Sequence, residues 1–204
     1  MPSSRIIAGT PAAETRRGRP RSERARRAIL SAAADLLLDN GAAHMSMGAV
    51  AERAGVSKAT IYRWWPSKQM LALEALLDWT VVDGPEPDTG TLRGDLLALL
   101  LPWVREIGAR PYGRVIAALV GEAQADEQFA AAYRTHFIEQ RRAPLRAAFE
   151  RAVARGEVSA ALDVEAAIDL IYGPVYHRAL HAHAPVTEGF ATIVIELALE
   201  GMLH

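Results

Sequence analysis

Two short helical patterns meet at a glycine in the first third of the chain, and this stretch constrains the fold more than any other. A serine that can cap a helix precedes each pattern, at Ser46 and at Ser57. Between them, Gly55 supplies the left-handed conformation that a tight break between helices needs. In the second pattern, Ile61 and Trp65 are four residues apart and share the face turned to the core. The stretch therefore predicts a helix-turn-helix, whose second helix suits the major groove of DNA.

The outer face of this second helix carries the side chains with which it would meet DNA. A lysine or threonine at a helix start can reach base edges or phosphates, and the helix dipole adds to the attraction for anions. The whole chain has only two lysines, Lys58 and Lys68, and both fall on this element. The alternative is that the stretch is only a compact three-helix packing unit.

The stretch also resembles a known family. Ala54-Gly55-Val56-Ser57, then Thr60-Ile61-Tyr62 and Trp65-Pro66-Ser67-Lys68, is similar to the DNA-binding signature of the tetracycline-repressor (TetR) family. The resemblance runs without a gap from Arg26 to about Leu77. It implies that the start of the recognition helix contacts bases, while the tyrosine and the later lysine hold phosphates. The expected DNA-binding residues are Ser46, Lys58, Ala59, Thr60, Tyr62, Trp64 and Lys68.

The net charge of −1 conceals a strong asymmetry. Residues 1–68 hold 12 Lys and Arg against 5 Asp and Glu, or +7, whereas residues 69–204 hold 11 against 19, or −8, and the two sum to −1. A basic end that carries a helix-turn-helix indicates nucleic acid on one side only. With no cysteine there is no disulfide, thiolate metal cage or thiol switch. No apolar run is long enough for a membrane span and the start is a poor secretory signal, so we expect a cytoplasmic protein.

The basic end begins with residues 1–22, which lack apolar periodicity and are expected to form a disordered arm. Within it, Arg17 and Arg19 flank a glycine and precede a proline, which resembles the core of an AT-hook. Such a segment lies extended in the narrow minor groove of A·T-rich DNA, where arginine is attracted. The alternative is a non-specific electrostatic tether.

The rest of the chain reads as helices. Apolar spacing predicts helices at about 22–38, 67–82, 92–107, 111–125, 126–155 and 187–203, with Gly156 ending the fifth and Pro144 able to kink it. Asp163 caps a further helix, whose apolar stripe includes Val164 and Val175. No stretch alternates with period two, so no strand is expected. We predict an all-α fold of about nine helices: a DNA-binding head at 23–70, joined through the helix at 67–82 to a larger helical-bundle domain at 71–204. The TetR resemblance implies the same architecture.

The last predicted helix is apolar on all sides, since Ile193 and Leu197 lie on one side and Ile195 and Leu199 on another. An all-round apolar helix must be covered all round. A second subunit is the expected cover, because the family's dimers pair their last two helices as a four-helix bundle. Burial within one subunit is the alternative.

The family's other feature is a ligand pocket. Tyrosine and tryptophan combine an apolar ring with a polar handle, as a pocket for aromatic or amphipathic molecules requires, although core packing explains each of them as well. The candidate ligand-binding residues are Trp103, Ile107, Ile116, Val120, Tyr133, Phe137, Tyr172 and Tyr176.

His177, His181 and His183 form a His-x3-His-x-His pattern, of which the first two share a helical face at metal-ligand spacing. Without a third ligand on that face or any cysteine, exposed or interface histidines are the better interpretation, and a protonation switch is a further option. We predict no metal and no cofactor.

An enzyme is the rival class of function. The sequence contains no P-loop, no Gly-x-Gly-x-x-Gly, no Gly-x-Ser-x-Gly and no His-Glu-x-x-His. An architectural DNA binder without an effector is a third class, against which the large second domain speaks. We therefore predict a homodimeric transcriptional regulator, most simply a repressor released from a palindromic operator by a small apolar or aromatic effector.

Overall fold

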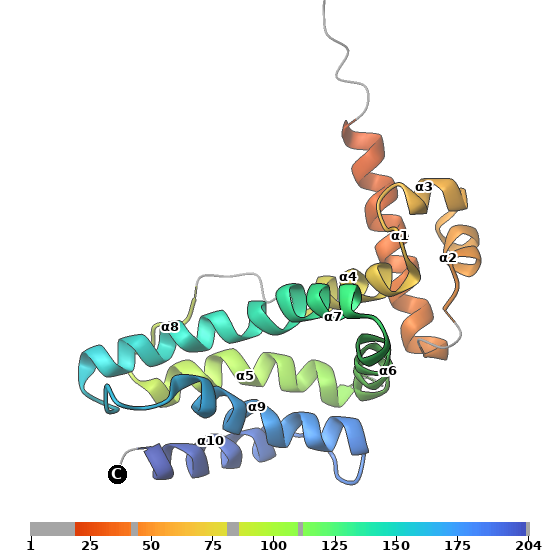
Figure 1. Ribbon diagram of the computed structural model, residues 1–204. Helices are drawn as coiled ribbons and strands as arrows, with labels where there is room; N and C mark the ends of the chain where they lie inside the picture. Colours follow the sequence, from red (N-terminus) through yellow and green to blue (C-terminus); the bar gives the residue numbers. More distant parts are fainter. Residues whose placement is uncertain (1–18, 42–44, 81–85, 110–111, 203–204) are drawn as a thin grey trace, which may run out of the picture.

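The structure, a computed structural model, describes residues 19–41, 45–80, 86–109 and 112–202. Every element in these ranges is helical, as the sequence predicts. Counting α7, η1 and α8 as one interrupted helix, the described ranges form nine helices (Figure 1). The bounds are α1 Arg19–Asn40, α2 Met47–Ala54, α3 Lys58–Tyr62, α4 Lys68–Thr80, α5 Leu92–Ala109, α6 Tyr112–Ala125, α7 Glu127–Tyr133, η1 Arg134–Ile138, α8 Glu139–Arg155, α9 Val164–His181 and α10 Glu188–Met202. None of these helices is long and apolar enough to span a membrane.

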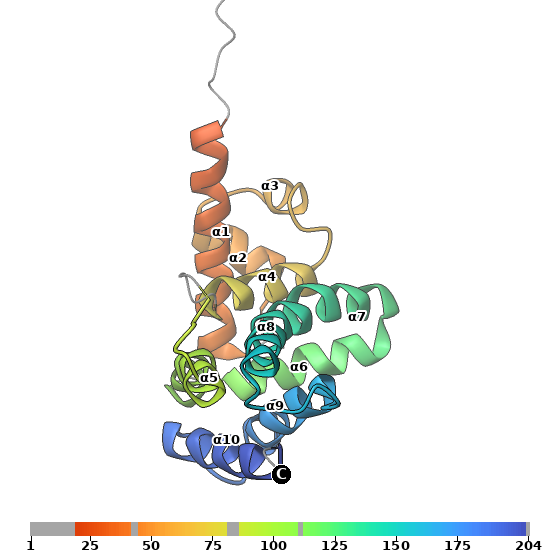
Figure 2. The ribbon, with the colours of Figure 1, turned by 90° about the vertical axis from the view of Figure 1, so that its left-hand side faces the viewer.

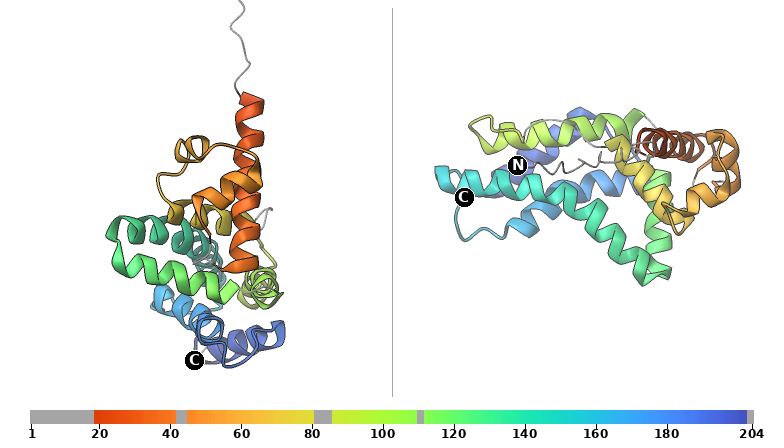
Figure 3. Two further views of the ribbon diagram at one scale, coloured as in Figure 1. Left: turned by 90° about the vertical axis from the view of Figure 1, so that its right-hand side faces the viewer. Right: turned by 90° about the horizontal axis from the view of Figure 1, so that it is seen from above.

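Helices α1 to α4 form a small head that stands at one end of the larger body (Figures 1 and 3). Helix α1 packs against α2 and α4, and α2 packs against α3. Ile61 and Trp65 are buried in the head core, as predicted. The carboxylate of Glu74 in α4 accepts hydrogen bonds from Arg26 of α1 and from the indole of Trp65. This one side chain therefore joins three segments of the head.

The helix ends follow the local sequence signals. The side chains of Ser46, Ser57, Ser67 and Asp163 each accept a hydrogen bond from the backbone N–H three residues later, at 3.1 to 3.3 Å. Gly41, Gly55 and Gly156 end α1, α2 and α8 with φ values of +75°, +65° and +74°. Each of these caps satisfies backbone groups that a helix end leaves without a partner.

Two helix boundaries differ from the prediction. Helix α1 begins at Arg19, within the segment expected to be a disordered arm, and Pro20 lies in its first turn. Proline is tolerated there because the first turn of a helix needs no backbone N–H. Helix α3 ends at Tyr62, with Trp64 and Trp65 in the turn that follows, so the recognition helix is shorter than predicted.

The irregularity of the long helix also lies elsewhere than expected. Pro144 is accommodated inside α8, and the break in regular winding is the π turn η1, about two turns earlier. The guanidinium of Arg141 donates to the carbonyl oxygen of Phe137 at 2.9 Å, within this turn. Such π turns in α-helices are frequent at functional sites.

In the body, α5 packs against α8 and α10, α6 against α7 and α9, and α9 against both α8 and α10. Helix α10 lies on the side of the body farthest from α1 (Figure 2). The helices α6 and α9 approach closely at Gly113, where an added Cβ would lie 1.9 Å from the carbonyl oxygen of Ala179. Only glycine permits this contact between the two backbones.

One carboxylate is fully buried in the body. Asp95 of α5 accepts hydrogen bonds from the backbone N–H and hydroxyl of Thr89, at 2.7 and 2.8 Å, and from Arg151 of α8 at 3.2 Å. Burial would raise the pKa of Asp95, but the bonds from Thr89 and Arg151 outweigh it and hold the pKa below its ordinary value. Asp95 is therefore ionised, and its bond with Arg151 holds the start of α5 against α8.

Candidate nucleic-acid interface and effector cavity

The outer face of α3 is open to solvent over most of the predicted DNA-binding residues. Lys58 and Ala59 are exposed, Thr60 is half-buried, and Tyr62 and Trp64 are 53% and 38% exposed. Large exposed aromatic side chains on a short helix and in the turn after it, with a buried opposite face, form a surface suited to a partner. Ser46 is also exposed at the start of α2.

Lys58 leans from α3 towards the beginning of α2. A Cβ added at Gly48 would lie 3.2 Å from Cε of Lys58 and 3.4 Å from its Nζ, so the ammonium group is next to the first turn of α2. Ser46 caps that same turn. A lysine ammonium beside a helix N-terminus forms a site for a phosphate group.

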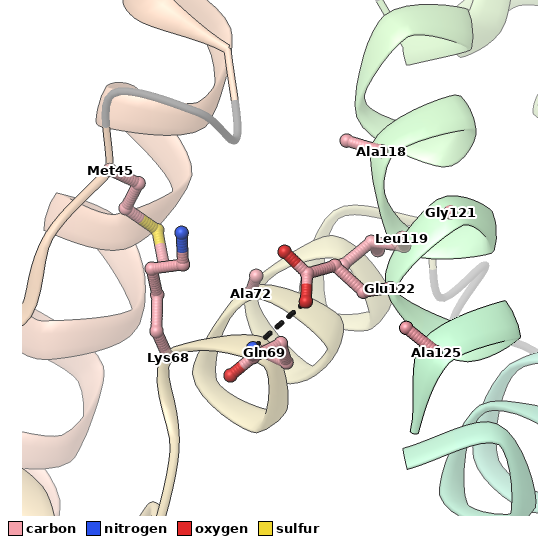
Figure 4. A pocket seen from close by; sticks show the side chains of 9 residues that line it. All are labelled: Met45, Lys68, Gln69, Ala72, Ala118, Leu119, Gly121, Glu122 and Ala125. Atoms are coloured by element: carbon pink, nitrogen blue, oxygen red, sulfur yellow. Dashed lines mark hydrogen bonds between the residues drawn. The ribbon is translucent and has the colours of Figure 1, made fainter. Parts of the chain in front are cut away.

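Lys68 has a different environment, because it lines the cleft between head and body (Figure 4). The cleft has a volume of about 440 Å³, with Met45, Lys68 and Ala72 on the head side and Leu119 and Glu122 of α6 on the body side. Across it, the side-chain amide of Gln69 donates to Glu122 at 3.0 Å. The start of α4 is thus bonded directly to α6.

From the sequence, the later part of α4 is expected to meet the body near Trp103 and Ile107, but its main contacts with the body lie elsewhere. Its main contacts are with α6, α7 and η1 rather than with α5, which carries Trp103 and Ile107. Within α4, Leu76 is buried and Leu77 is half-buried.

The arm residues divide between two parts of the chain. Arg17 lies outside the described residues, and Arg19 is the first residue of α1. An extended Gly-Arg-Pro segment in a minor groove would therefore require the first turn of α1 to unwind.

The aromatic candidate ligand residues form two groups of rings in the body, and two cavities lie beside them. The ring of Trp103 lies 5.2 Å from the rings of both Tyr172 and Tyr176, and Tyr133 stacks on Phe137 at 4.9 Å. Tyr172 and Tyr176 line a cavity of about 380 Å³ between α8 and α9, whereas Val120 and Tyr133 line another of about 340 Å³ near α7. The remaining four, Trp103, Ile107, Ile116 and Phe137, are buried in the core and line neither of these two cavities.

Burial also fixes the charge state of the tyrosines. It raises the pKa values of Tyr133, Tyr172 and Tyr176 above the ordinary value of about 10. The three phenols are therefore neutral hydrogen-bond donors at physiological pH. Tyr172 donates to the backbone oxygen of Arg141 at 3.1 Å.

The sequence analysis missed Arg141, which is the most informative polar side chain in this region. Its guanidinium lies 3.7 Å from the centre of the Phe137 ring and donates to the hydroxyl of Tyr112 at 3.3 Å. Arg141 stands in the run Glu139-Gln-Arg-Arg, which resembles a solvated helix face. No local signal separates it from Arg142 beside it.

The three histidines come together at the end of α9, with the His177 ring 4.7 Å from that of His181 and 4.9 Å from that of His183. All three are exposed. Within the described ranges, no group of three or more His, Cys, Asp or Glu side chains is arranged to hold a metal ion.

A long apolar groove follows α9 and α10 on the outside of the body. It has a volume of about 530 Å³ and is lined by Leu170 of α9 and by Ile193, Leu197 and Met202 of α10. Leu170, Ile193 and Leu197 are 61%, 58% and 63% exposed. The opposite side of α10, with Ile195 and Leu199, is buried against the body. Apolar side chains this exposed and this close together are unusual on a monomer.

Comparison with known proteins agrees with the two-part architecture. Residues 29–75 match the model described as bacterial regulatory proteins, tetR family, and residues 86–198 match the tetracyclin repressor-like, C-terminal domain. The chain is 39% identical over 189 residues to the HTH-type transcriptional regulator YdeS of Bacillus subtilis (strain 168), covering 93% of this chain and 95% of YdeS.

Solved structures share the fold. The TetR family transcription regulator SCO0332 has 38% identity and a TM-score of 0.70, over 87% of this chain and 98% of that one. FadR from Bacillus subtilis, solved in complex with stearoyl-CoA, has 16% identity and a TM-score of 0.68, over 86% and 98% of the two chains. The family and these relatives are transcriptional regulators and not enzymes. The chain belongs to the TetR family of DNA-binding transcriptional regulators.

Proposed function

We propose that this regulator is a homodimeric repressor that leaves a palindromic operator when a small molecule binds in its body. The observation that carries the proposal is the double role of α4. The middle of this helix holds the segment after the recognition helix through Glu74 and Trp65, and its start is bonded to α6 through Gln69 and Glu122. Any ligand that moves α6 or η1 therefore acts directly on the head.

For DNA, the exposed face of α3 supports base contacts by Ala59 and Thr60 and a phosphate contact by Tyr62, while Trp64 is exposed in the turn that follows. The position of Lys58 beside the first turn of α2 favours a phosphate contact over a base contact for this residue. Lys58→Ala should then weaken binding to all operator variants alike and lower the salt slope by about one unit. A loss of preference confined to one base pair would assign Lys58 to base recognition instead.

Lys68 and the arm are proposed as further phosphate and minor-groove contacts. Because Lys68 lines the head–body cleft, Lys68→Ala should change both DNA affinity and its response to ligand, whereas Tyr62→Phe should change DNA affinity only. Removal of residues 1–18, which include Arg17, should reduce affinity. A loss limited to operators with A·T-rich flanks would support minor-groove insertion by the arm over a plain electrostatic tether.

The groove of α9 and α10 supports the dimer, since a second copy would cover Leu170, Ile193 and Leu197 with the same residues of its own groove. Leu197→Asp should produce monomers in sedimentation velocity and abolish tight operator binding, because a dimer reads two half-sites. Leu180→Asp is the matched control: Leu180 is exposed on α9 and lies outside the groove. Equal dissociation of the two variants would contradict this interface.

The fold can hold a ligand: FadR, which shares it, was solved with stearoyl-CoA. The decisive experiment is a calorimetric titration of a ligand that binds this protein, with and without operator DNA. Linkage requires operator to weaken ligand binding by the same factor by which ligand weakens operator binding. Equal ligand affinities in the two titrations would exclude induction and favour an architectural role. Gln69→Leu should reduce the coupling while both separate affinities persist.

A further inference from the structure

The cavity between α8 and α9 has an opening and a closed end. Asp169 and Gly173 of α9 are exposed at its rim. Tyr172 and Tyr176, which lie one and two turns after Asp169 on the same face of α9, are deeper. Ile138, the last residue of η1, lines this cavity and also the neighbouring one near α7. A ligand that enters at the rim therefore meets an apolar wall, Ile138, on the side of the π turn. The cavity near α7 lies on the other side of this residue.

The hydroxyl group of Tyr176 lies at the deep end of the cavity and is available to donate a hydrogen bond. The side-chain oxygen of Tyr176 is buried and finds no hydrogen-bond partner in the part of the chain that the structure describes. A buried hydroxyl without a partner costs free energy, so native structures supply one from protein, water or ligand. Burial raises the pKa of Tyr176 well above its ordinary value, so the group is a neutral donor and would meet an acceptor rather than a cation.

Charged side chains also line this cavity. Arg142 and Asp169 both line it, but they form an ion pair with each other, and Glu165 also pairs with Arg142. The remaining charged group of the lining is Arg141, whose guanidinium is held in place by the Phe137 ring and by the Tyr112 hydroxyl. A guanidinium fixed on an aromatic ring is pre-organised to bind a carboxylate.

We propose that this cavity binds an amphipathic organic anion, an aromatic or compact aliphatic carboxylate, whose carboxylate accepts hydrogen bonds from the Tyr176 hydroxyl and the Arg141 guanidinium. Its apolar part lies against the Tyr172 ring and Ile138. The proposal narrows the effector class of the repressor proposed above and rests on that function only for its effect on DNA. A cationic drug would meet the wrong charge here, and a purely apolar molecule would leave the Tyr176 hydroxyl unbonded.

The test uses three probes of one shape: 2-naphthoate, the neutral 2-naphthamide, and the cation 2-naphthylmethylammonium. Each is titrated by calorimetry into the full-length protein without DNA. We expect naphthoate to bind at least tenfold more tightly than naphthamide, and the cation to bind most weakly, because hydrogen bonds to a charged group are stronger than neutral ones. Equal affinity of anion and amide, or no binding of naphthoate, would overturn the proposal.

Two variants locate the anion. Tyr176→Phe removes one oxygen and should weaken naphthoate roughly tenfold, weaken naphthamide less, and not lower the thermal midpoint, because the lost hydroxyl had no partner. Arg141→Gln should abolish the preference for the anion. Arg146→Gln is the control, since Arg146 lies one turn along α8, pairs with Glu139 and Glu165, and does not line the cavity. If Arg141→Gln fails to fold, Tyr176→Phe decides alone; unchanged naphthoate affinity in it would refute the site.

The effect of the ligand on operator affinity is measured separately from its binding to the cavity. If naphthoate binds with the expected dependence on Tyr176 but operator affinity stays the same at saturation, the anion site stands and the induction mechanism is contradicted. If another ligand releases the operator while its binding ignores Tyr176→Phe, induction stands and the anion site falls.

Discussion

The head and the body of this regulator are held together by different kinds of contact. In the head, the serine caps and Gly55 act over three or four residues. In the body, the bonds that fix one helix on another join residues far apart in sequence, such as Arg93 and Glu196, 103 positions apart, or Leu92 and Glu157. The turn before the recognition helix is thus specified locally, although Glu74 also ties α4 to Arg26, 48 positions away, whereas the packing of the body depends on bonds between distant residues.

The largest expected effect comes from the buried carboxylate of the body. Asp95→Asn should destabilise the protein by ~3 kcal/mol, because it removes the charge of the buried carboxylate that Thr89 and Arg151 bind. Chemical denaturation followed by circular dichroism measures this. Asp88→Asn is the control, because Asp88 is exposed and lies 3.8 Å from the same arginine. Similar losses in both variants would show that the body is not held at Asp95.

In the head, Glu74 is the carboxylate that joins separate segments, as Asp95 does in the body. Glu74→Ala removes the acceptor of the buried Trp65 indole and the partner of Arg26, so a loss of about 2 kcal/mol is expected. Because α4 supports the recognition helix through the bond from Trp65 to Glu74, operator affinity should fall as well. Glu52→Ala, at an exposed position of α2, should change neither quantity by a comparable amount. An intact operator affinity in Glu74→Ala would mean that the head does not need this link.

The third test separates the stability of the head from its reading of DNA. Ser57→Ala should cost about 1 kcal/mol, because the N-terminus of α3 loses its cap. Ser57→Asp should keep the cap and the stability, since aspartate is an equally good N-cap. It should nevertheless weaken operator binding, because it places a negative charge at the DNA surface. Full operator affinity in Ser57→Asp would place α3 away from the phosphates.

The smallest effect is expected at acid pH, in an exposed network of the body. Hydrogen bonds from Arg146 and Arg142 lower the pKa of Glu165 to about 2, from its ordinary value of 4.5. Because the folded pKa is depressed, this carboxylate contributes stability above pH 4.5 and loses it as the pH falls towards 2. Glu165→Gln should flatten the fall of the thermal midpoint between pH 5 and 2.5, whereas Glu52→Gln should follow the parent. Parallel curves for all three proteins would remove Glu165 from the acid response.

The contrast between the two regions also explains which features the sequence predicts. The caps, the buried Ile61 and Trp65 and the exposed face of α3 follow from spacings within one or two turns, so the sequence alone was enough to predict them. The position of α4 against α6, the burial of Arg141 and the pairing of Arg142 with Asp169 arise only when separate helices pack together. The aromatic candidate ligand residues are an intermediate case: residue type indicated them, but packing decided that Tyr172 and Tyr176 line a cavity while Trp103 and Phe137 do not.

The π turn η1 has a consequence for the angular phase of the longest helix. A π turn holds one residue more than an α turn, and each residue rotates an α-helix by about 100° and advances it by about 1.5 Å. Helix α7 on one side of the turn contacts α4 of the head, and α8 on the other side carries Arg141. Rewinding η1 as regular α-helix with all its residues kept would turn the whole of α7 by about that angle relative to α8. The extra residue therefore works as a spacer that keeps the half of the helix facing the head in register with the half facing the cavity.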